Sequence, residues 1–237
     1  MKILPMNKDF LLFKCIHCGP LDSSNIETKN RSGETVSKEQ FERNRKFLAR
    51  LIDTYGSCAM LAIEGNSVVA HVRFYPKIIL DRFEFCCHVS DYAITSEMVE
   101  MDLPEIKTPA DRNLKINCFL VDKAYRGQGL SGDLITAIVE WAGSNGWNTV
   151  SALAAHDNYW LSLQMCIPKL NTYQKLGFEM KKKVVIPEAK EHLKNIREGK
   201  LGADKQKEFE LHCGGKDADE LSSLYEVERG VAPRGLV

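Results

Sequence analysis

The sequence of 237 residues lacks an excess of charge of either sign, because 32 Lys and Arg residues balance 32 Asp and Glu residues. A strongly basic surface is what draws a protein to the phosphates of nucleic acids or to an anionic membrane. We therefore expect neither nucleic acid nor a membrane among the partners of this chain.

Long hydrophobic runs are also missing. No apolar stretch approaches the roughly 20 residues that a helix needs to cross a bilayer. Near the N-terminus only residues 10–13 are continuously apolar, and Lys14 follows them, so this run is too short for the core of a signal peptide. We therefore expect a cytoplasmic protein in which the eight cysteines stay reduced and form no disulfide framework.

The cysteines leave one alternative open, which is a metal site. Cys15 and Cys18 have the C-x-x-C spacing, and Cys86, Cys87 and His88 could add further ligands. One C-x-x-C pair supplies only two of the four ligands that a structural zinc ion takes. The prediction is therefore that no metal is bound and that these cysteines are unliganded.

Hydrophobic spacing predicts a mixed α/β domain. Apolar residues recur at helical intervals over residues 37–55, and the apolar runs 59–63 and 68–75 flank a short turn, as in a β-hairpin. Residues 83–89 are typical of a strand, whereas residues 101–113, with two prolines, indicate a loop.

A strand, glycine loop, helix and strand follow one another over residues 114–155. The runs 114–121 and 149–155 are apolar, and residues 132–141 place Leu and Ile on one helical face. A helix between two strands favours a crossover connection and parallel strands.

The glycine loop has two interpretations. Gly127, Gly129 and Gly132 spell G-x-G-x-x-G, the dinucleotide pattern, with Asp157 about where a ribose-binding carboxylate would fall. However, five residues separate Val121 from the first glycine, and no further alternation of strands and helices completes a doubly wound sheet. In both interpretations the glycines turn N–H groups toward an anion, so a phosphate ligand is expected. An oxidoreductase with a nicotinamide or flavin cofactor remains one alternative.

The second interpretation rests on a family resemblance. The segment 121–130, V-D-K-A-Y-R-G-Q-G-L, resembles the acyl-CoA pyrophosphate loop R-x-x-G-x-G/A of the GNAT N-acetyltransferase superfamily. About 50 residues later, Tyr173 to Phe178, Y-Q-K-L-G-F, resembles the Y-x-K-x-G-F segment of that family. Two departures are that Ser131 stands where Gly or Ala is usual and that Pro168 interrupts the segment before the tyrosine.

The resemblance extends over residues 37–185 and implies a GNAT-type central mixed β-sheet flanked by helices. We expect an irregular segment before it, residues 1–36, and a charged helical C-terminal extension after it, residues 186–237. The extension shows a helical pattern broken at Gly199 and Gly202 and then a short helical pattern with a tail. It could pack across a partner chain in a homodimer, fold over the acceptor, or form a solvated helix with a flexible tail.

The function that the resemblance implies is transfer of an acetyl group from acetyl-CoA to an amine, in a small molecule or a protein, by direct attack on the thioester. The alternative is a non-catalytic sensor that only binds acyl-CoA. Backbone groups of the strand would face the pantetheine arm, and those of the loop would hold the pyrophosphate. These residues are Phe119, Leu120, Val121, Arg126, Gly127, Gln128, Gly129, Leu130, Ser131 and Gly132.

Two residues are expected to carry the chemistry. Tyr173 matches the position from which family members protonate the departing thiolate, and a phenol with a pKa of ~10 keeps its proton at neutral pH. The alternative is that Tyr173 only packs beside Phe178. The strand carries no carboxylate that could serve as a base, so His156, just past a strand end, is our candidate general base. Asp157 and Glu64 are the alternative bases, and a purely structural histidine is the other interpretation.

Overall fold

We describe the fold from a computed structural model of the chain. The residues described are 1–8, 21–22, 38–83, 94–165, 167–185, 187–216 and 218–231. They form two compact units, one of Met1–Val150 with Gly230–Val237 and the other of Ser151–Arg229. The mixed α/β class predicted from the sequence is confirmed. Within these described residues, every helix is too short or too polar to span a membrane.

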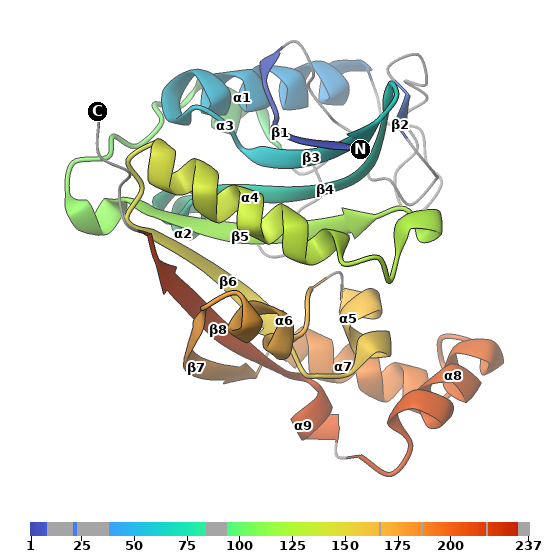
Figure 1. The fold of residues 1–237 in the computed structure, drawn as a ribbon. Helices are drawn as coiled ribbons and strands as arrows, with labels where there is room; N and C mark the ends of the chain where they lie inside the picture. The colour runs from blue at the N-terminus through green and yellow to red at the C-terminus, as the bar shows by residue number, and fades with distance from the viewer. Residues whose placement is uncertain are drawn as a thin grey trace. The chain divides into compact units, whose positions relative to one another are not determined.

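The first unit is built on an antiparallel sheet (Figure 1). Strands β1, β3, β4 and β5 follow one another across it, and β2 pairs with β4. The strands are β1 (Lys2–Pro5), β2 (Leu21–Asp22), β3 (Ala59–Glu64), β4 (Ser67–Pro76) and β5 (Asn113–Val121). The predicted hairpin of β3 and β4 is confirmed, and only Gly65 and Asn66 form its turn.

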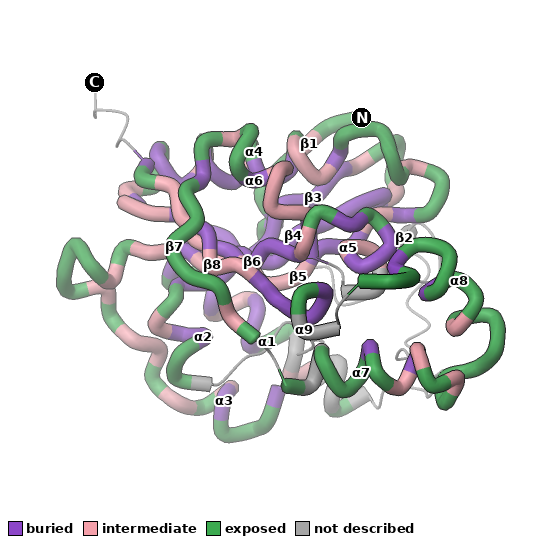
Figure 2. Tube along the Cα trace, turned by 90° about the horizontal axis from the view of Figure 1, so that it is seen from below, coloured by how far each residue is buried: buried purple, intermediate pink, exposed green. Residues whose placement is uncertain are grey.

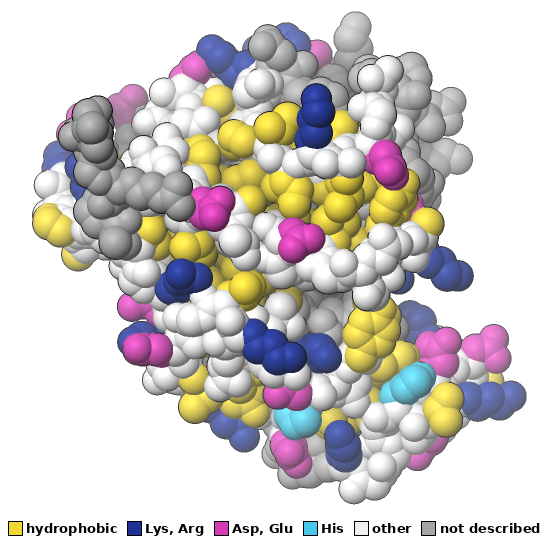
Figure 3. Space-filling model, viewed as in Figure 1, with side chains coloured by type: hydrophobic (Ala, Val, Ile, Leu, Met, Phe, Trp, Pro, Cys, Tyr) yellow, Lys and Arg dark blue, Asp and Glu magenta, His cyan; other side chains and the backbone are white. Residues whose placement is uncertain are grey.

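Helices pack against this sheet and bury its central strand. Helix α4 (Leu130–Ser144) contacts β1, β3, β4 and β5, and α2 (Lys77–Phe83) contacts β4 and β5. Every residue of β4 after Ser67 is buried, as Figure 2 shows, and Phe74 packs against Trp141 of α4 with ring centroids 5.1 Å apart. Hydrophobic side chains remain at the surface over β1 (Figure 3), where Leu4 is 47% exposed.

The helix predicted over residues 37–55 is α1 (Lys38–Tyr55). It is hydrogen-bonded to the predicted loop of residues 101–113, which follows α3 (Ser96–Glu100). The Tyr55 hydroxyl donates to the carbonyl of Pro104 at 2.6 Å. The sequence analysis missed α2 and α3. The strand predicted over residues 83–89 lies outside the described residues, apart from Phe83, which is instead the last residue of α2.

The second unit contains three strands, β6 (Thr149–Ala155), β7 (Glu179–Val185) and β8 (Ser223–Gly230). Strand β8 lies between β6 and β7 and is antiparallel to β7 (Figure 1). The sequence analysis expected a short helical pattern and a tail in this part of the chain. That expectation is wrong for β8, because pairing with two distant strands gives its residues an extended conformation.

Three helices connect β7 to β8, and we call them the helical insert. They are α7 (Pro187–Arg197), α8 (Ala203–Cys213) and α9 (Ala218–Leu221). The predicted break between the first two is confirmed at residues 198–202. The insert is not simply solvated, because it shares a hydrophobic cluster with α5 (Tyr159–Met165). The cluster comprises Trp160, Leu161, Leu193, Ile196, Phe209, Cys213 and Leu221.

Trp160 lies at the centre of the contacts between α5 and α8. Its ring meets Phe209 edge-on at a centroid distance of 5.9 Å and stacks on His212 at 6.4 Å. Its indole N–H donates to Glu208 Oε2 at 3.2 Å. Asn158, just before α5, donates to the carbonyl of His212 at 2.9 Å. These contacts fix the insert against the residues that follow β6.

We predict that Phe209→Ala destabilises the protein strongly. The ring is 1% exposed, so its removal leaves a cavity in the cluster, and the free energy of unfolding should fall by about 3–5 kcal/mol. Leu211→Ala is the matched control on the same helix, because that side chain is 79% exposed and its loss should change stability by less than about 0.5 kcal/mol. Urea denaturation measures both values. Equal effects of the two variants would show that the cluster does not stabilise the fold.

Candidate functional site

The glycine loop leads from a short 3-10 helix, η5 (Lys123–Tyr125), into α4. Gly127 and Gly129 have φ values of +78° and +84°, a backbone conformation that residues with a Cβ rarely adopt. A Cβ at either position would meet no atom within 4 Å. The backbone conformation, and not a lack of space, is therefore what requires glycine here.

The loop presents a set of unpaired backbone donors. In the described part of the chain, the N–H groups of residues 127–131 meet no acceptor, and no side chain caps α4. The N–H of Gly132 differs, because it donates to the carbonyl of Gly129 at 2.8 Å. Unpaired N–H groups at the start of a helix, next to the positive end of its dipole, favour an anion.

Side chains hold this loop against the end of β5. The Asp122 carboxylate accepts from the N–H of Ala124 at 2.9 Å, and Gln128 Nε2 donates to the carbonyl of Ala124 at 3.0 Å. Arg126 Nε donates to the carbonyl of Val121 at 3.1 Å, and within the described residues its guanidinium makes no ion pair. The loop conformation is therefore fixed by its own residues, and the charge of Arg126 stays beside the unpaired N–H groups.

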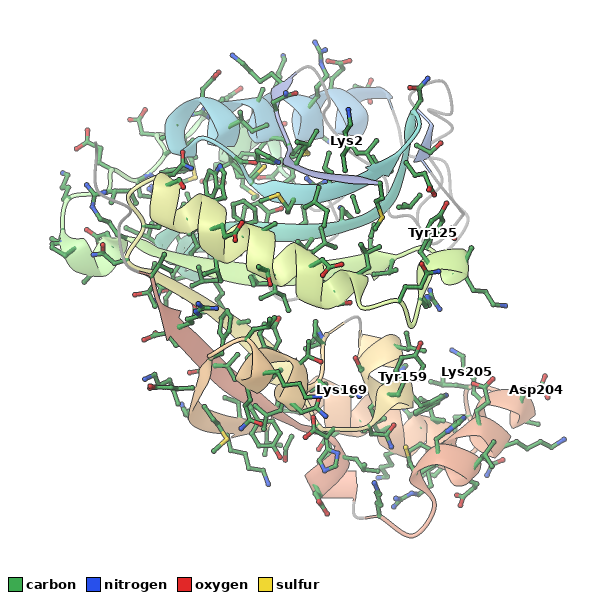
Figure 4. The ribbon with its side chains drawn as sticks, in the orientation of Figure 1. Lys2, Tyr125, Tyr159, Lys169, Asp204 and Lys205 are labelled. Carbon is green, nitrogen blue, oxygen red and sulfur yellow. The ribbon has the colours of Figure 1, made fainter. Side chains whose placement is uncertain are left out.

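The carboxylate of Glu64, one of the alternative bases, already accepts a hydrogen bond. Figure 4 shows Tyr125 projecting from η5, and its hydroxyl donates to the carboxylate of Glu64 at the end of β3. This hydrogen bond raises the pKa of Tyr125 above its ordinary value. The pair ties the β3–β4 hairpin to the glycine loop, and the carboxylate that a base would need is already an acceptor.

Strand β5 contains a β-bulge just before the predicted pantetheine-binding residues. The register between β4 and β5 shifts so that Asn117 has no partner on β4. Bulges increase the local twist and often occur next to functional sites. Beyond it, the side chains of Phe119 and Leu120 are buried and that of Val121 is half-buried. The bulge was not predicted from the sequence.

Tyr173 lies on α6 (Leu170–Lys175) in the second unit and is fully buried. Its ring packs edge-on against Phe178, with centroids 5.1 Å apart, as the structural interpretation requires. Its hydroxyl, however, has no hydrogen-bond partner among the described residues. Burial raises the pKa of Tyr173 well above its ordinary value, so the hydroxyl keeps its proton. A buried hydroxyl without a partner is unusual in proteins.

The chain after Tyr173 explains the spacing of the Y-x-K-x-G-F segment. Gly177 has a φ of +79°, a conformation common just past the end of a helix. The turn brings the N–H of Phe178 to within 3.1 Å of the carbonyl of Tyr173. The two aromatic rings meet because the glycine reverses the chain between them.

The segment before Tyr173, which contains Pro168, docks α6 onto the end of β6. The N–H of Ala155 donates to the carbonyl of Pro168 at 2.9 Å, and Lys169, which precedes α6, forms a parallel bridge with Ala155. The Asp157 carboxylate accepts from the N–H of Asn171, in the first turn of α6, at 2.9 Å. Asp157, an alternative base in the sequence analysis, therefore acts as a helix cap, and Tyr173 is positioned through it.

His156 follows β6 directly and pairs with a residue that the sequence analysis missed. Its Nε2 lies 3.3 Å from Oε1 of Glu220 on α9, and its side chain is 19% exposed. Its Nδ1 is buried and has no hydrogen-bond partner within the described parts of the chain. No local pattern distinguishes Glu220 from the other acidic residues of the insert, because the pair joins residues 64 positions apart.

The structure thus divides the predicted site residues between the two units. Residues 119–132 belong to the first unit, and His156, Asp157 and Tyr173 belong to the second. The cysteines and the histidine of the metal alternative, Cys15, Cys18, Cys86, Cys87 and His88, all lie outside the described residues.

Comparison with known proteins identifies related sequences and folds. A model of the acetyltransferase (GNAT) family matches residues 25–178, more than half of the chain, and this range includes the glycine loop and Tyr173. No curated protein matches the chain. Similar solved structures include Ard1 from Thermoplasma volcanium, with 12% identity, a TM-score of 0.43 and 97% of both chains covered. Another is the IAA acetyltransferase from Bacillus cereus ATCC 14579, with 12% identity, a TM-score of 0.41 and 97% and 98% coverage. A third is the ribosomal-protein-S18-alanine N-acetyltransferase from Escherichia coli, with 11% identity, a TM-score of 0.42 and 92% and 95% coverage.

We predict that Gly129→Ala and Gly132→Ala change stability in opposite directions. Alanine at 129 must adopt a positive φ, so the free energy of unfolding should fall by about 1–2 kcal/mol. Alanine at 132 lies inside α4, meets no atom within 4 Å and should raise it by about 0.5–1 kcal/mol. Chemical denaturation measures both. A Gly129→Ala variant as stable as the wild type would show that the loop does not hold the left-handed conformation.

Proposed function

The chain belongs to the acetyltransferase (GNAT) family, and from that premise we propose that it is an N-acetyltransferase that transfers the acetyl group of acetyl-CoA to an amine. The observation that carries this proposal is the hydroxyl of Tyr173, which is buried, has no partner among the described residues and is held in its protonated form. A proton donor of this kind is what a departing thiolate requires. A module that only binds acyl-CoA has no use for one.

The glycine loop is the proposed binding site for the pyrophosphate of acetyl-CoA. The unpaired N–H groups of residues 127–131 would donate to the phosphate oxygens, and Arg126 would add a positive charge beside them. Gly132 would contribute as part of the first turn of α4, because its own N–H is already bonded. The backbone of Phe119, Leu120 and Val121, at the end of β5, is proposed to face the pantetheine arm.

Acetyl-CoA supplies an acetyl group that is activated as a thioester, and residues of this chain would accept and donate the protons of the reaction. The nitrogen of the uncharged amine must lose a proton as the C–N bond forms, so we assign His156 as the base, with Nδ1 as the accepting atom. Tyr173 would donate its hydroxyl proton to the sulfur as the C–S bond breaks and the C–N bond forms. Its raised pKa keeps the hydroxyl of Tyr173 protonated before the reaction, so Tyr173 does not act as a base.

The test is turnover. The protein is incubated with acetyl-CoA and a panel of small amines and peptides with free N-termini, and released thiol is measured. An acetyltransferase releases thiol and acetylates at least one amine of the panel. Tight binding of acetyl-CoA with no turnover on any amine would favour the sensor, and binding of NAD or FAD instead would favour the dinucleotide interpretation of the loop.

We predict that Tyr173→Phe lowers kcat by about 100-fold, because the thiolate then leaves without a positioned proton donor. The KM for acetyl-CoA should change by less than about twofold, since the hydroxyl is proposed to act only as the bond breaks. Tyr55→Phe is the matched control, because it removes a hydroxyl that bonds the carbonyl of Pro104. It should lower stability by about 1 kcal/mol and leave kcat unchanged. An unchanged kcat in Tyr173→Phe would remove the acid role of this residue.

A further inference from the structure

We propose that Glu220 is a positioning residue for His156, so that the helical insert supplies part of the catalytic machinery. This inference rests on the proposed function, in which His156 is the base. Glu220 is 64 positions further along the chain than His156, on helix α9, which precedes β8 in the sequence.

Glu220 Oε1 lies 3.3 Å from Nε2 of His156. An ionised carboxylate can only accept, so Nε2 must carry the hydrogen in this contact. A neutral imidazole has one N–H and one lone pair, and the lone pair is therefore on Nδ1. Glu220 thus selects the tautomer in which Nδ1 is the base.

The surroundings of Nδ1 agree with this assignment. The atom is buried and has no hydrogen-bond partner among the described residues. A buried acceptor left unpaired destabilises the protein and is uncommon, and we infer that the amine substrate supplies the missing donor. The neighbouring carboxylate of Asp157 does not compete for the ring, because it already caps α6 through the N–H of Asn171.

Both partners of this pair are held by the insert and its hydrophobic cluster. Leu221, next to Glu220 on α9, is fully buried in the cluster shared with α5. Arg197 of α7 donates to the carbonyl of Lys216, shortly before α9, at 2.8 Å. On the other side, Asn158, two residues after His156, donates to the carbonyl of His212. The carboxylate and the imidazole are thus positioned by the same packed helices.

The proton balance of the step is simple. The amine proton moves to Nδ1 as the new C–N bond forms, which gives an imidazolium that still donates from Nε2 to Glu220. The carboxylate stabilises this positive charge, and the imidazolium then returns its proton to water. The Tyr173 phenolate that is left after protonation of the sulfur regains a proton from water. Glu220 neither gains nor loses a proton, and it acts only through His156.

The experiment combines a spectroscopic readout with kinetics. The ¹⁵N chemical shifts of the His156 ring distinguish the two tautomers, and we expect the Nε2–H form in the wild type. Glu220→Ala and the isosteric Glu220→Gln should both lose this preference. Alanine removes the acceptor, and the amide of glutamine can either donate or accept. Glu208→Gln is the matched control, since Glu208 lies on the insert but bonds Trp160. It should leave the His156 tautomer and kcat unchanged.

In the kinetic arm, acetyl-CoA is used with the best amine of the panel. Glu220→Ala should lower kcat by about tenfold or more and leave the KM for acetyl-CoA unchanged. In the His156→Ala background the same substitution should have no further effect, because Glu220 acts through the ring. A wild-type tautomer that does not depend on Glu220 would overturn the inference. So would a Glu220→Ala variant with full activity when His156→Ala is impaired.

A failure of the proposed function gives a result that can be distinguished from a failure of the role of Glu220. If the wild type turns over no amine, the acetyltransferase assignment falls, and the inference falls with it. If His156→Ala keeps full activity while the wild type turns over, the base assignment and the role of Glu220 are overturned and the acetyltransferase stands.

Discussion

The hydrophobic cluster between α5 and the helical insert is the constraint on which the second unit depends. Its residues come from α5 and from three helices that follow β7, and all of them are buried. No local preference brings these segments together, so the burial of apolar surface must do it. The cluster thereby fixes helix α9, which bears Glu220, and the backbone that follows His156, as the contacts of Leu221 and Asn158 show.

The glycine loop is organised on a different principle. Its conformation follows from two glycines and from hydrogen bonds among residues 121–128, all close together in the sequence. The groups that we propose to bind the pyrophosphate are backbone N–H groups, which any residue other than proline supplies once the backbone has the correct conformation. The proposed binding at this loop would thus tolerate changes of side chain that leave the backbone conformation intact, whereas the proposed acid and base depend on particular side chains and on their burial.

This difference explains what the sequence could and could not predict. The β3–β4 hairpin and helices α1 and α4 depend on local spacing and on turn residues, and these predictions are confirmed. The ligand of the glycine loop stays a prediction. Strand β8 and the partner of His156 depend on contacts between distant segments, so no local pattern indicated them. Asp157 and Glu64 were plausible bases from their chemistry alone, and only the structure shows that each carboxylate already accepts a hydrogen bond.

The central claim is that the loop of residues 126–132 binds the pyrophosphate of acetyl-CoA. Calorimetric titration of the full chain with acetyl-CoA, with NAD and FAD in parallel, tests it most directly. The account predicts saturable binding of acetyl-CoA with one molecule per chain, weakened in Gly129→Ala, and no binding of the two dinucleotides. Binding of NAD or FAD in place of acetyl-CoA would contradict it and would support the dinucleotide interpretation of the glycine pattern.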